Sequence, residues 1–199
     1  MDTAPWLIVG LGNPGTSYAG NRHNIGSMTI AELAQGASTT LKQHKSARAR
    51  AAEVRLGTGA GGLPGPRAVI ATPMTYMNVS GGPVAGLAQF YKVALEQIII
   101  VHDELDLEPG QVRLKRGGGE GGHNGLRSIS QSLGSKDYLR VRLGIGRPPG
   151  RQDPADYVLS DFPARDREQT LLLIGDGVDA VNDLVNLGLE SAQQRFHSR

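Results

Sequence analysis

The sequence contains no cysteine among its 199 residues. It can therefore form neither a disulfide framework nor a thiolate metal site, and it offers no cysteine nucleophile. It also lacks an apolar run of about 18 residues, which is the length that a membrane-spanning helix needs. No basic, apolar and small-residue leader precedes the first apolar run. We therefore expect a soluble, cytoplasmic protein without a membrane span.

A strong charge of either sign is missing as well. The sequence has 21 Lys and Arg against 19 Asp and Glu, a formal net charge of +2, and its pI is about 9.0. So small an excess neither requires nor excludes a nucleic-acid partner, and the position of the basic residues matters more than their number. Arg113, Lys115 and Arg116 lead directly into a glycine-rich segment at residues 117–125.

The length and the order of apolar segments predict the fold. The sequence has no internal repeat, and its length fits one domain over residues 1–199. Strand-like and helix-like segments alternate, which predicts an α/β single-domain sandwich with a mixed β-sheet, parallel at its centre, flanked by helices. The expected strands cover residues 6–9, 48–56, 68–71, 97–101 and 138–145; the expected helices cover residues 25–35, 81–92, 126–133 and a C-terminal helical segment from about 163, with a polar tail.

Local patterns add detail to this outline. Charged and apolar residues alternate in 48–56 and in 138–145, so we expect both strands to join the sheet as antiparallel additions. Asn24 and Ser80 precede predicted helices and are the expected N-caps. Gly175 and Gly177 weaken the prediction of one unbroken C-terminal helix.

Residues 7–26, LIVGLGNPGTSYAGNRHNIG, hold a dense group of chemically capable side chains. An apolar strand ends there at a glycine-rich turn, and ligand sites lie beyond the carboxyl ends of such strands. Glycines at positions 10, 12 and 15 have the spacing of a dinucleotide-binding turn. However, Pro14 precedes the third glycine, polar loop continues to Arg22, and Glu32 falls inside a predicted helix rather than at a strand end. We do not expect a nucleotide cofactor.

Polar side chains recur where separate predicted elements end. They comprise three of the five histidines, an aspartate and several asparagines: His23, His102, His123, Asp103, Asn13, Asn24, Asn78 and Asn124. Any one of these could be a surface or turn residue. Their repetition after separate strands favours convergence on one edge of the sheet.

This set of side chains suits attack of water on an acyl ester. A histidine held by a carboxylate can take a proton from water, and asparagine amides can bind an ester carbonyl and its developing negative charge. No serine or cysteine nucleophile stands in an elbow motif. Metal binding by His23, His102, Asp103 and His123 is the rival interpretation, although no His-x-x-x-His pair supports it.

Four ordered sequence blocks resemble bacterial peptidyl-tRNA hydrolases. The first runs from Leu11-Gly12-Asn13-Pro14-Gly15 through Tyr18 to Arg22-His23-Asn24, and the second is Met77-Asn78 with Ser80-Gly81. The third is His102-Asp103-Glu104-Leu105-Asp106, and the fourth is the glycine run that ends at His123-Asn124-Gly125. The resemblance covers residues 7 to about 146 in the order and spacing of that family, and it thins after Pro148.

The resemblance implies a function and a role for each matching residue. His23 would be the general base for the attacking water, Asp103 the carboxylate that orients it, and Asn78 the oxyanion donor. Tyr18, Met77 and His123 would line the same cleft, in which Asn13 and Asn124 bind the peptide and the ester. The implied reaction is hydrolysis of the ester between a peptide and the terminal ribose of tRNA, with no metal and no cofactor.

The resemblance also implies contacts with tRNA. The candidates to contact phosphate are basic residues near the predicted cleft: Arg113, Lys115, Arg116 and Arg147. Arg140 and Arg142 could do the same, or could solvate an exposed strand. Asn21 and Glu120 depart from the family pattern near the cleft mouth, and a carboxylate at position 120 would repel phosphate unless a cation neutralises it.

Peptidyl-tRNA is thus the expected partner of a monomer with no obligate protein partner. Two other functions stay open at this point. One is a metal-dependent hydrolase using His23, Asp103 and His123, and the other is a non-catalytic RNA-binding module.

Overall fold

The computed structural model describes residues 4–198. Its strands are β1 (Trp6–Gly10), β2 (Lys42–Gln43), β3 (Ala49–Arg55), β4 (Arg67–Pro73), β5 (Ile98–Glu104), β6 (Val112–Arg116) and β7 (Leu139–Gly144). Its α-helices are α1 (Ile25–Gly36), α2 (Gly81–Tyr91), α3 (Asn124–Leu133), α4 (Pro154–Val158), α5 (Arg167–Leu187) and α6 (Leu189–His197). Short 3-10 helices are η1 (Arg22–Asn24), η2 (Ala60–Gly62), η3 (Met77–Val79), η4 (Leu95–Gln97) and η5 (Ala164–Asp166).

The described strands form one mixed sheet of seven strands in the order β2-β3-β4-β1-β5-β7-β6. Strand β1 is parallel to both β4 and β5, and β5 is parallel to β7. The outer strands β3 and β6 are antiparallel to their neighbours. Four parallel strands at the centre therefore end at one edge of the sheet. The expected α/β fold with a centrally parallel sheet is confirmed.

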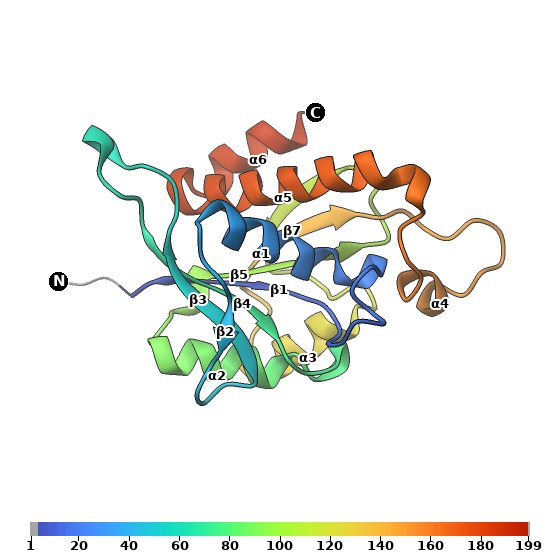
Figure 1. The fold of residues 1–199 in the computed structure, drawn as a ribbon, viewed down its shortest axis with the longest axis horizontal. Helices are drawn as coiled ribbons and strands as arrows, with labels where there is room; N and C mark the ends of the chain where they lie inside the picture. Colours follow the sequence, from blue (N-terminus) through green and yellow to red (C-terminus); the bar gives the residue numbers. More distant parts are fainter. Residues whose placement is uncertain (1–3, 199) are drawn as a thin grey trace.

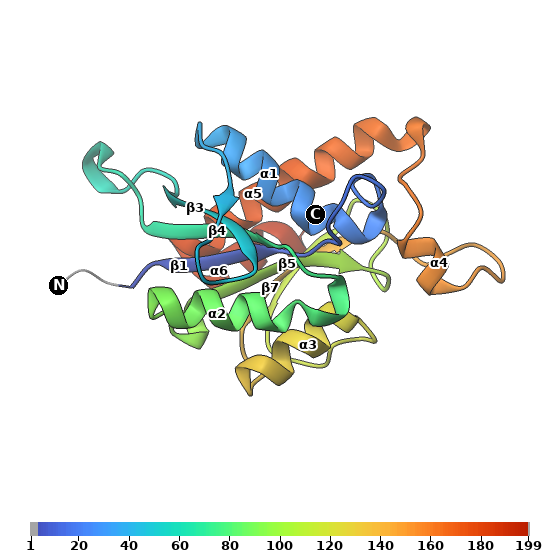
Figure 2. The ribbon, with the colours of Figure 1, turned by 60° about the horizontal axis from the view of Figure 1, so that its bottom comes forward.

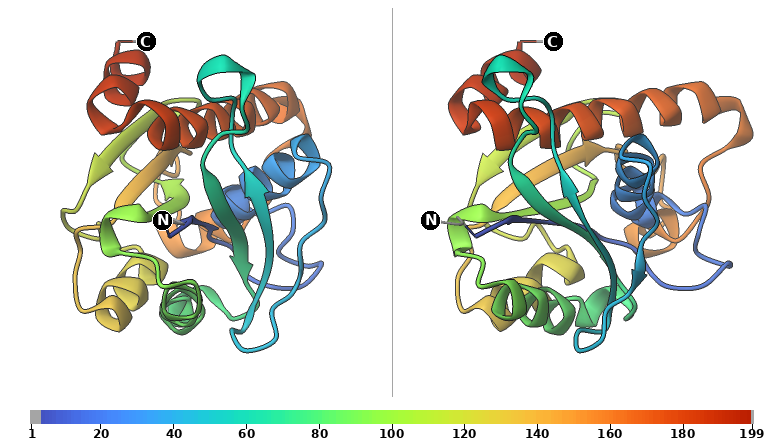
Figure 3. Two further views of the ribbon diagram at one scale, coloured as in Figure 1. Left: turned by 90° about the vertical axis from the view of Figure 1, so that its left-hand side faces the viewer. Right: turned by 60° about the vertical axis from the view of Figure 1, so that its left-hand side comes forward.

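Helices cover both faces of the sheet (Figure 1). Helices α1, α5 and α6 lie on one face, and α2 and α3 lie on the other, as the turned views also show (Figures 2 and 3). Side chains alternate across β1 accordingly: Ile8 packs in the cluster beneath α1 and α5, whereas Leu7 and Val9 pack in the cluster beneath α2 and α3. The short helix α4 stands apart at the carboxyl end of the parallel strands.

Glycines set how closely the opening helix approaches the sheet. A Cβ on Gly10 would meet the carbonyl of Gly26, and a Cβ on Gly26 would meet the carbonyl of Val101. Helix α1 therefore packs with its first turn against β1 and β5, which brings η1, just before it, to the end of β5. The glycine-rich stretch fixes the geometry of this approach, and Gly15 adopts a φ of +99° that suits its turn.

Two expectations about the elements are wrong, and one helix was missed. Strand β7 was expected to be an antiparallel addition, but it runs parallel to β5 and lies between β5 and β6. Its alternating pattern misled because its arginines are buried or half-buried rather than exposed to solvent. The residues after α5 form helix α6 rather than a polar tail, and α6 covers the edge of β6, where Gln193 and His197 bond the main chain of Leu114. Helix α4 was not predicted. Helix α5 is unbroken despite its two glycines, and at Gly177 the absence of a Cβ leaves room for Thr29 of α1.

Candidate active site

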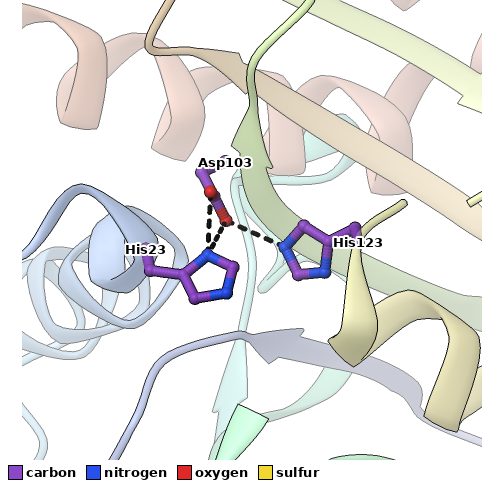
Figure 4. A group of neighbouring side chains, drawn as sticks. All are labelled: His23, Asp103 and His123. Atoms are coloured by element: carbon purple, nitrogen blue, oxygen red, sulfur yellow. Dashed lines mark hydrogen bonds and ion pairs between the residues drawn. The ribbon is translucent and has the colours of Figure 1, made fainter. Parts of the chain in front are cut away.

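Two histidines and one carboxylate meet at the carboxyl edge of the sheet (Figure 4). His23 comes from η1, Asp103 from the end of β5, and His123 from the residue before α3. The Nδ1 atom of His23 lies 2.8 and 3.0 Å from the two carboxylate oxygens of Asp103. The Nε2 atom of His123 lies 2.9 Å from Asp103 Oδ1. Distant parts of the sequence thus converge, as the polar strand ends predicted.

Hydrogen bonds fix the proton positions on both rings. His123 Nδ1 accepts from the backbone amides of Gly125 and Leu126, so its proton is on Nε2, which donates to Asp103. His23 donates from Nδ1 to the same carboxylate. The Nε2 atom of a neutral His23 therefore carries the free lone pair, which is the form that a general base requires.

The electrostatics keep Asp103 ionised. Burial raises its pKa, but the charges and hydrogen bonds of His23 and His123 outweigh burial and hold the pKa of Asp103 well below its usual value. Burial has the opposite effect on His23 and lowers its pKa. The charge and hydrogen bonds of Asp103 outweigh this and leave the pKa of His23 raised above 6.5. The Asp103 side chain is only 2% exposed, and the His23 side chain is 13% exposed. A buried anion thus supports a histidine that solvent can reach.

The carboxamide of Asn13 is held in one orientation. Its Oδ1 accepts a 2.7 Å hydrogen bond from the amide of Met77, which leaves Nδ2 as the group free to donate. Asn24 holds the backbone of the same residue, because its side chain accepts from Asn13 N and donates to Asn13 O, each at 2.9 Å. The turn therefore presents a fixed amide donor beside the histidine pair.

These side chains line a cleft of about 460 Å³. Its walls come from η1, the loop around η3, the glycine run and α4; the lining residues are Asn13, His23, Tyr76, Met77, Asn78, Asp103, Glu104, Leu105, Glu120, Gly121, Gly122, His123, Asn124, Pro154, Ala155, Val158 and Leu159. The ring of Tyr18 packs edge-on against that of Tyr76, with the ring centroids 6.3 Å apart. Of the side chains that the sequence singled out around this edge of the sheet, Tyr18, Asn24 and His102 are absent from the lining.

The model of the peptidyl-tRNA hydrolase family matches residues 7–199 of this chain. The chain belongs to the peptidyl-tRNA hydrolase family. A peptidyl-tRNA hydrolase from Kineococcus radiotolerans is 61% identical over 193 residues, which cover 97% of each chain. One from Frankia alni is 57% identical over 197 residues, covering 99% of this chain and 96% of that protein. The crystal structure of peptidyl-tRNA hydrolase from Acinetobacter baumannii matches with a TM-score of 0.85 at 37% identity, covering 98% of this chain and 96% of that one.

One wall of the cleft comes from α4, which sequence patterns did not indicate. Arg22, the neighbour of His23, fastens this segment: its Nη1 donates to Ser160 Oγ at 2.6 Å and to the carbonyl of Asp161 at 3.0 Å, and its guanidinium lies 4.2 Å from the Tyr157 ring centre. Asn21 is buried and donates to the Asp161 side chain at 2.7 Å. Asn21, which departs from the family pattern, therefore helps to hold the segment that follows α4 in place.

The structure corrects both predicted N-caps. Asn24 makes no capping hydrogen bond to α1, because its amide is engaged by Asn13. Ser80 is fully buried and donates to the carbonyl of Met77, while Ser128 Oγ accepts from the first amide of α2. Asn24 is thus held by the preceding turn, and at α2 the capping acceptor comes from Ser128 on α3 instead of from Ser80.

Arg140 is not available to phosphate. It is 1% exposed, and its guanidinium donates to the carbonyls of Gly118, Gly119 and Lys136 at 2.7–3.3 Å. It therefore supports the glycine run that leads to His123, rather than contacting RNA or solvating a strand. Arg142 is half-buried, with its Nε 3.5 Å from Glu104 Oε2.

The other predicted cations have local partners but are not enclosed. Arg113 donates to the carbonyl of Phe196 at 3.1 Å, Arg116 donates to that of Asp137 at 3.2 Å, and Arg147 pairs with Asp106 at 2.6 Å. Lys115 lies half-buried beside the glycine run. The carboxylate of Glu120 is 3.2 Å from Lys136 Nζ. The neutralising cation at position 120 is thus Lys136, not one of the three basic residues before the glycine run.

His23, Asp103 and His123 also form a possible metal-ligand set, with one donor atom each within 4.8 Å of one another. An ion there would have to replace the protons that His23 and His123 donate to Asp103, since those nitrogens face the carboxylate. The donor types fit zinc, but the existing hydrogen bonds already satisfy them.

Within residues 4–198, no helix is both long and apolar enough to cross a membrane.

Proposed function

We propose that this chain hydrolyses the ester bond between the peptide and the tRNA of peptidyl-tRNA, using water that His23 activates and no metal ion. Family membership supplies the substrate class. The observation that supports the mechanism is the free Nε2 of His23, whose Nδ1–H is committed to a buried carboxylate. A base with its tautomer fixed in this way can accept a proton from water as the oxygen attacks.

The reaction proceeds through a tetrahedral intermediate. Water attacks the ester carbonyl carbon while its proton passes to His23 Nε2, and the carbonyl oxygen takes up negative charge. Collapse of the intermediate breaks the bond to the terminal ribose oxygen, and the imidazolium returns the proton to that oxygen. The products are tRNA with a free ribose hydroxyl and a peptide carboxylic acid, which releases its remaining proton to solvent and becomes a carboxylate.

Amide groups stabilise the charge and hold the peptide. We assign the oxyanion donor role to Asn78, an exposed residue on η3 that lines the cleft. The free Nδ2 of Asn13 donates to a peptide or ester carbonyl, and Asn124 at the start of α3 binds the peptide from the other wall. Met77 and the ring of Tyr18, through its contact with Tyr76, shape the same wall. In this proposal a substrate that lacks the amide leaves these groups unpaired and is a poorer substrate.

His123 has a second role besides the cleft-lining one that the sequence indicated. Its Nε2–H gives Asp103 a second charge-assisted hydrogen bond, which fixes the orientation of the carboxylate that accepts from His23. We therefore assign His123 as a positioning residue that acts through Asp103, besides its place in the lining.

The acceptor stem of the tRNA approaches over the basic side chains near the glycine run. Arg113, Lys115, Arg116 and Arg147 contact phosphate in this proposal, in exchange for their weaker local partners. We further propose that residues 1–199 act as one monomeric domain in the cytoplasm, with no obligate protein partner.

A chelator experiment tests the proposal. Purified protein should release the acetylated amino acid from N-acetyl-aminoacyl-tRNA in the presence of a chelator, and His23→Ala should abolish release while tRNA binding persists. Activity that is lost to the chelator and restored by zinc would favour the metal-dependent alternative. Binding without turnover in both conditions would favour an RNA-binding module.

A further inference from the structure

The parallel ladder between β1 and β5 stops just before Asp103. The last hydrogen bond of this ladder lies one residue past the end of β1, where Leu11 N donates to Val101 O at 3.0 Å. Two residues further on, the next amide on this side of β1 is that of Asn13, and it donates to the side chain of Asn24 instead. The chain after β1 has therefore left the ladder, and the backbone of β5 continues alone.

The carbonyl of Asp103 faces the side from which β1 has departed. Successive residues of a strand direct their carbonyls to opposite sides, and the next carbonyl, that of Glu104, bonds Ile145 N on the β7 side. Asp103 O therefore faces the β1 side, as Val101 O does. The donor that it finds is the imidazole of its neighbour: His102 Nδ1 lies 2.7 Å from Asp103 O. A backbone carbonyl can only accept, so Nδ1 carries the proton.

The surroundings of His102 suit it to act as a permanent hydrogen-bond donor and keep it from exchanging protons with solvent. It is 1% exposed, its ring packs edge-on against His123 with centroids 5.1 Å apart, and its Nε2 has no hydrogen-bond partner within residues 4–198. Burial and the nearby charges of His123 and Arg140 lower the pKa of His102 to about 3, against weaker opposing effects of Asp103. It thus stays neutral, with one donor.

We propose that His102 is a positioning residue: its Nδ1–H replaces the missing strand partner of Asp103 and holds the backbone that carries the orienting carboxylate between His23 and His123. The inference rests on the proposed roles of His23 and Asp103 and adds a residue that touches neither substrate nor water. Without this donor, Asp103 O would be a buried, unpaired acceptor, and the end of β5 would shift to find water.

Two substitutions that both remove the ring separate the donor from the packing. His102→Asn keeps an N–H donor close to the position of Nδ1, whereas His102→Leu fills the space without one. We expect His102→Asn to retain kcat within about threefold, and His102→Leu to lower kcat at least about tenfold with KM within about twofold. In His102→Leu the apparent pKa on the acid side of the rate profile should also fall, because His23 loses part of the influence of Asp103.

His44→Asn is the matched control, since His44 accepts from the amides of Ser46 and Ala47 in a surface hairpin away from the cleft. It should leave the rate profile unchanged. Equal turnover in the Asn and Leu variants at position 102, whether high or low, would overturn the proposal.

A spectroscopic measurement on the unsubstituted protein does not depend on any variant folding. Long-range ¹H–¹⁵N spectra should show His102 as the neutral Nδ1–H tautomer from pH 5 to pH 8. An Nε2–H tautomer or a protonated ring would overturn the proposal even if the enzyme is active. Failure of the proposed function would show separately, as absence of hydrolysis in the unsubstituted protein.

Discussion

Asp103→Asn tests the centre of the site most directly, because it changes one oxygen into an N–H donor at nearly constant shape. The carboxylate now accepts from both His23 and His123. An asparagine has one acceptor oxygen, so its amide group would face the N–H of one histidine. His23 can avoid this clash by moving its proton to Nε2, which removes the lone pair that accepts the proton of the attacking water.

The size of the effect follows from this loss of the basic tautomer. We expect kcat to fall about 10²- to 10⁴-fold, the range that general-base catalysis and loss of an orienting carboxylate supply. Stability should change far less. Loss of a charge-assisted acceptor costs about 1.5–3 kcal/mol, but removal of a buried charge offsets part of that cost.

The assay is release of acetylated amino acid from N-acetyl-aminoacyl-tRNA, run beside urea unfolding of the same preparations. Asp183→Asn is the matched control, because Asp183 is also buried and charge-paired, with Arg195 at 2.9 Å, but lies in the contact between α5 and α6. It should lose stability and keep kcat. Turnover of Asp103→Asn within about threefold of the unsubstituted protein would refute the orienting role.

Further outcomes can be measured on the same material. Activity should be full at high pH and fall as pH drops through an apparent pKa above 6.5, since His23 must be neutral and its pKa is raised; a kcat/KM profile with a lower pKa would contradict this. Arg22→Gln should loosen α4, raise KM about fivefold and leave kcat within about twofold, with faster hydrogen exchange at residues 154–160. Asn24→Ala should leave the opening turn without its buried partners, lowering stability to urea by about 1–3 kcal/mol. In the unfolded protein His102 takes up a proton as the pH falls below 6.5, whereas in the folded protein its pKa is about 3 and it stays neutral until the pH falls that far. Stability should therefore fall across that window by up to about 1.4 kcal/mol per pH unit, and less steeply in His102→Asn.

Sequence alone predicted the features that depend on local pattern. The β-branched run before His102 and the glycine-rich turn after β1 each carry their own signal, because strand period and turn chemistry are written in neighbouring residues. Parallel strands end at a common edge, so the residues after them could be grouped correctly. Pairing of His23 with Asp103 followed from that rule together with the family resemblance.

The tertiary structure decided where each polar side chain finds its partner. Asn24 and Ser80 have the residue types of helix caps, yet Asn24 bonds the backbone of Asn13, and the first amide of α2 donates to Ser128 rather than to Ser80. Arg140 alternates like a surface residue but is buried, because the carbonyls of the glycine run need donors. No local pattern distinguishes these outcomes, since each depends on a partner more than 10 residues away or on the packing of a whole loop.

The residues that the sequence singled out at its opening keep their importance, but their support comes from elsewhere in the chain. His23 and Asn13 could be named from the turn in which they stand. Only the fold shows that Met77 orients Asn13, that His123 shares Asp103 with His23, and that α4 lines one wall of the cleft. Sequence by itself determined which groups could do the chemistry, because residue type sets their acidity and hydrogen bonding. The fold decided their proton positions and orientation, because those depend on neighbours that only folding brings within 3 Å.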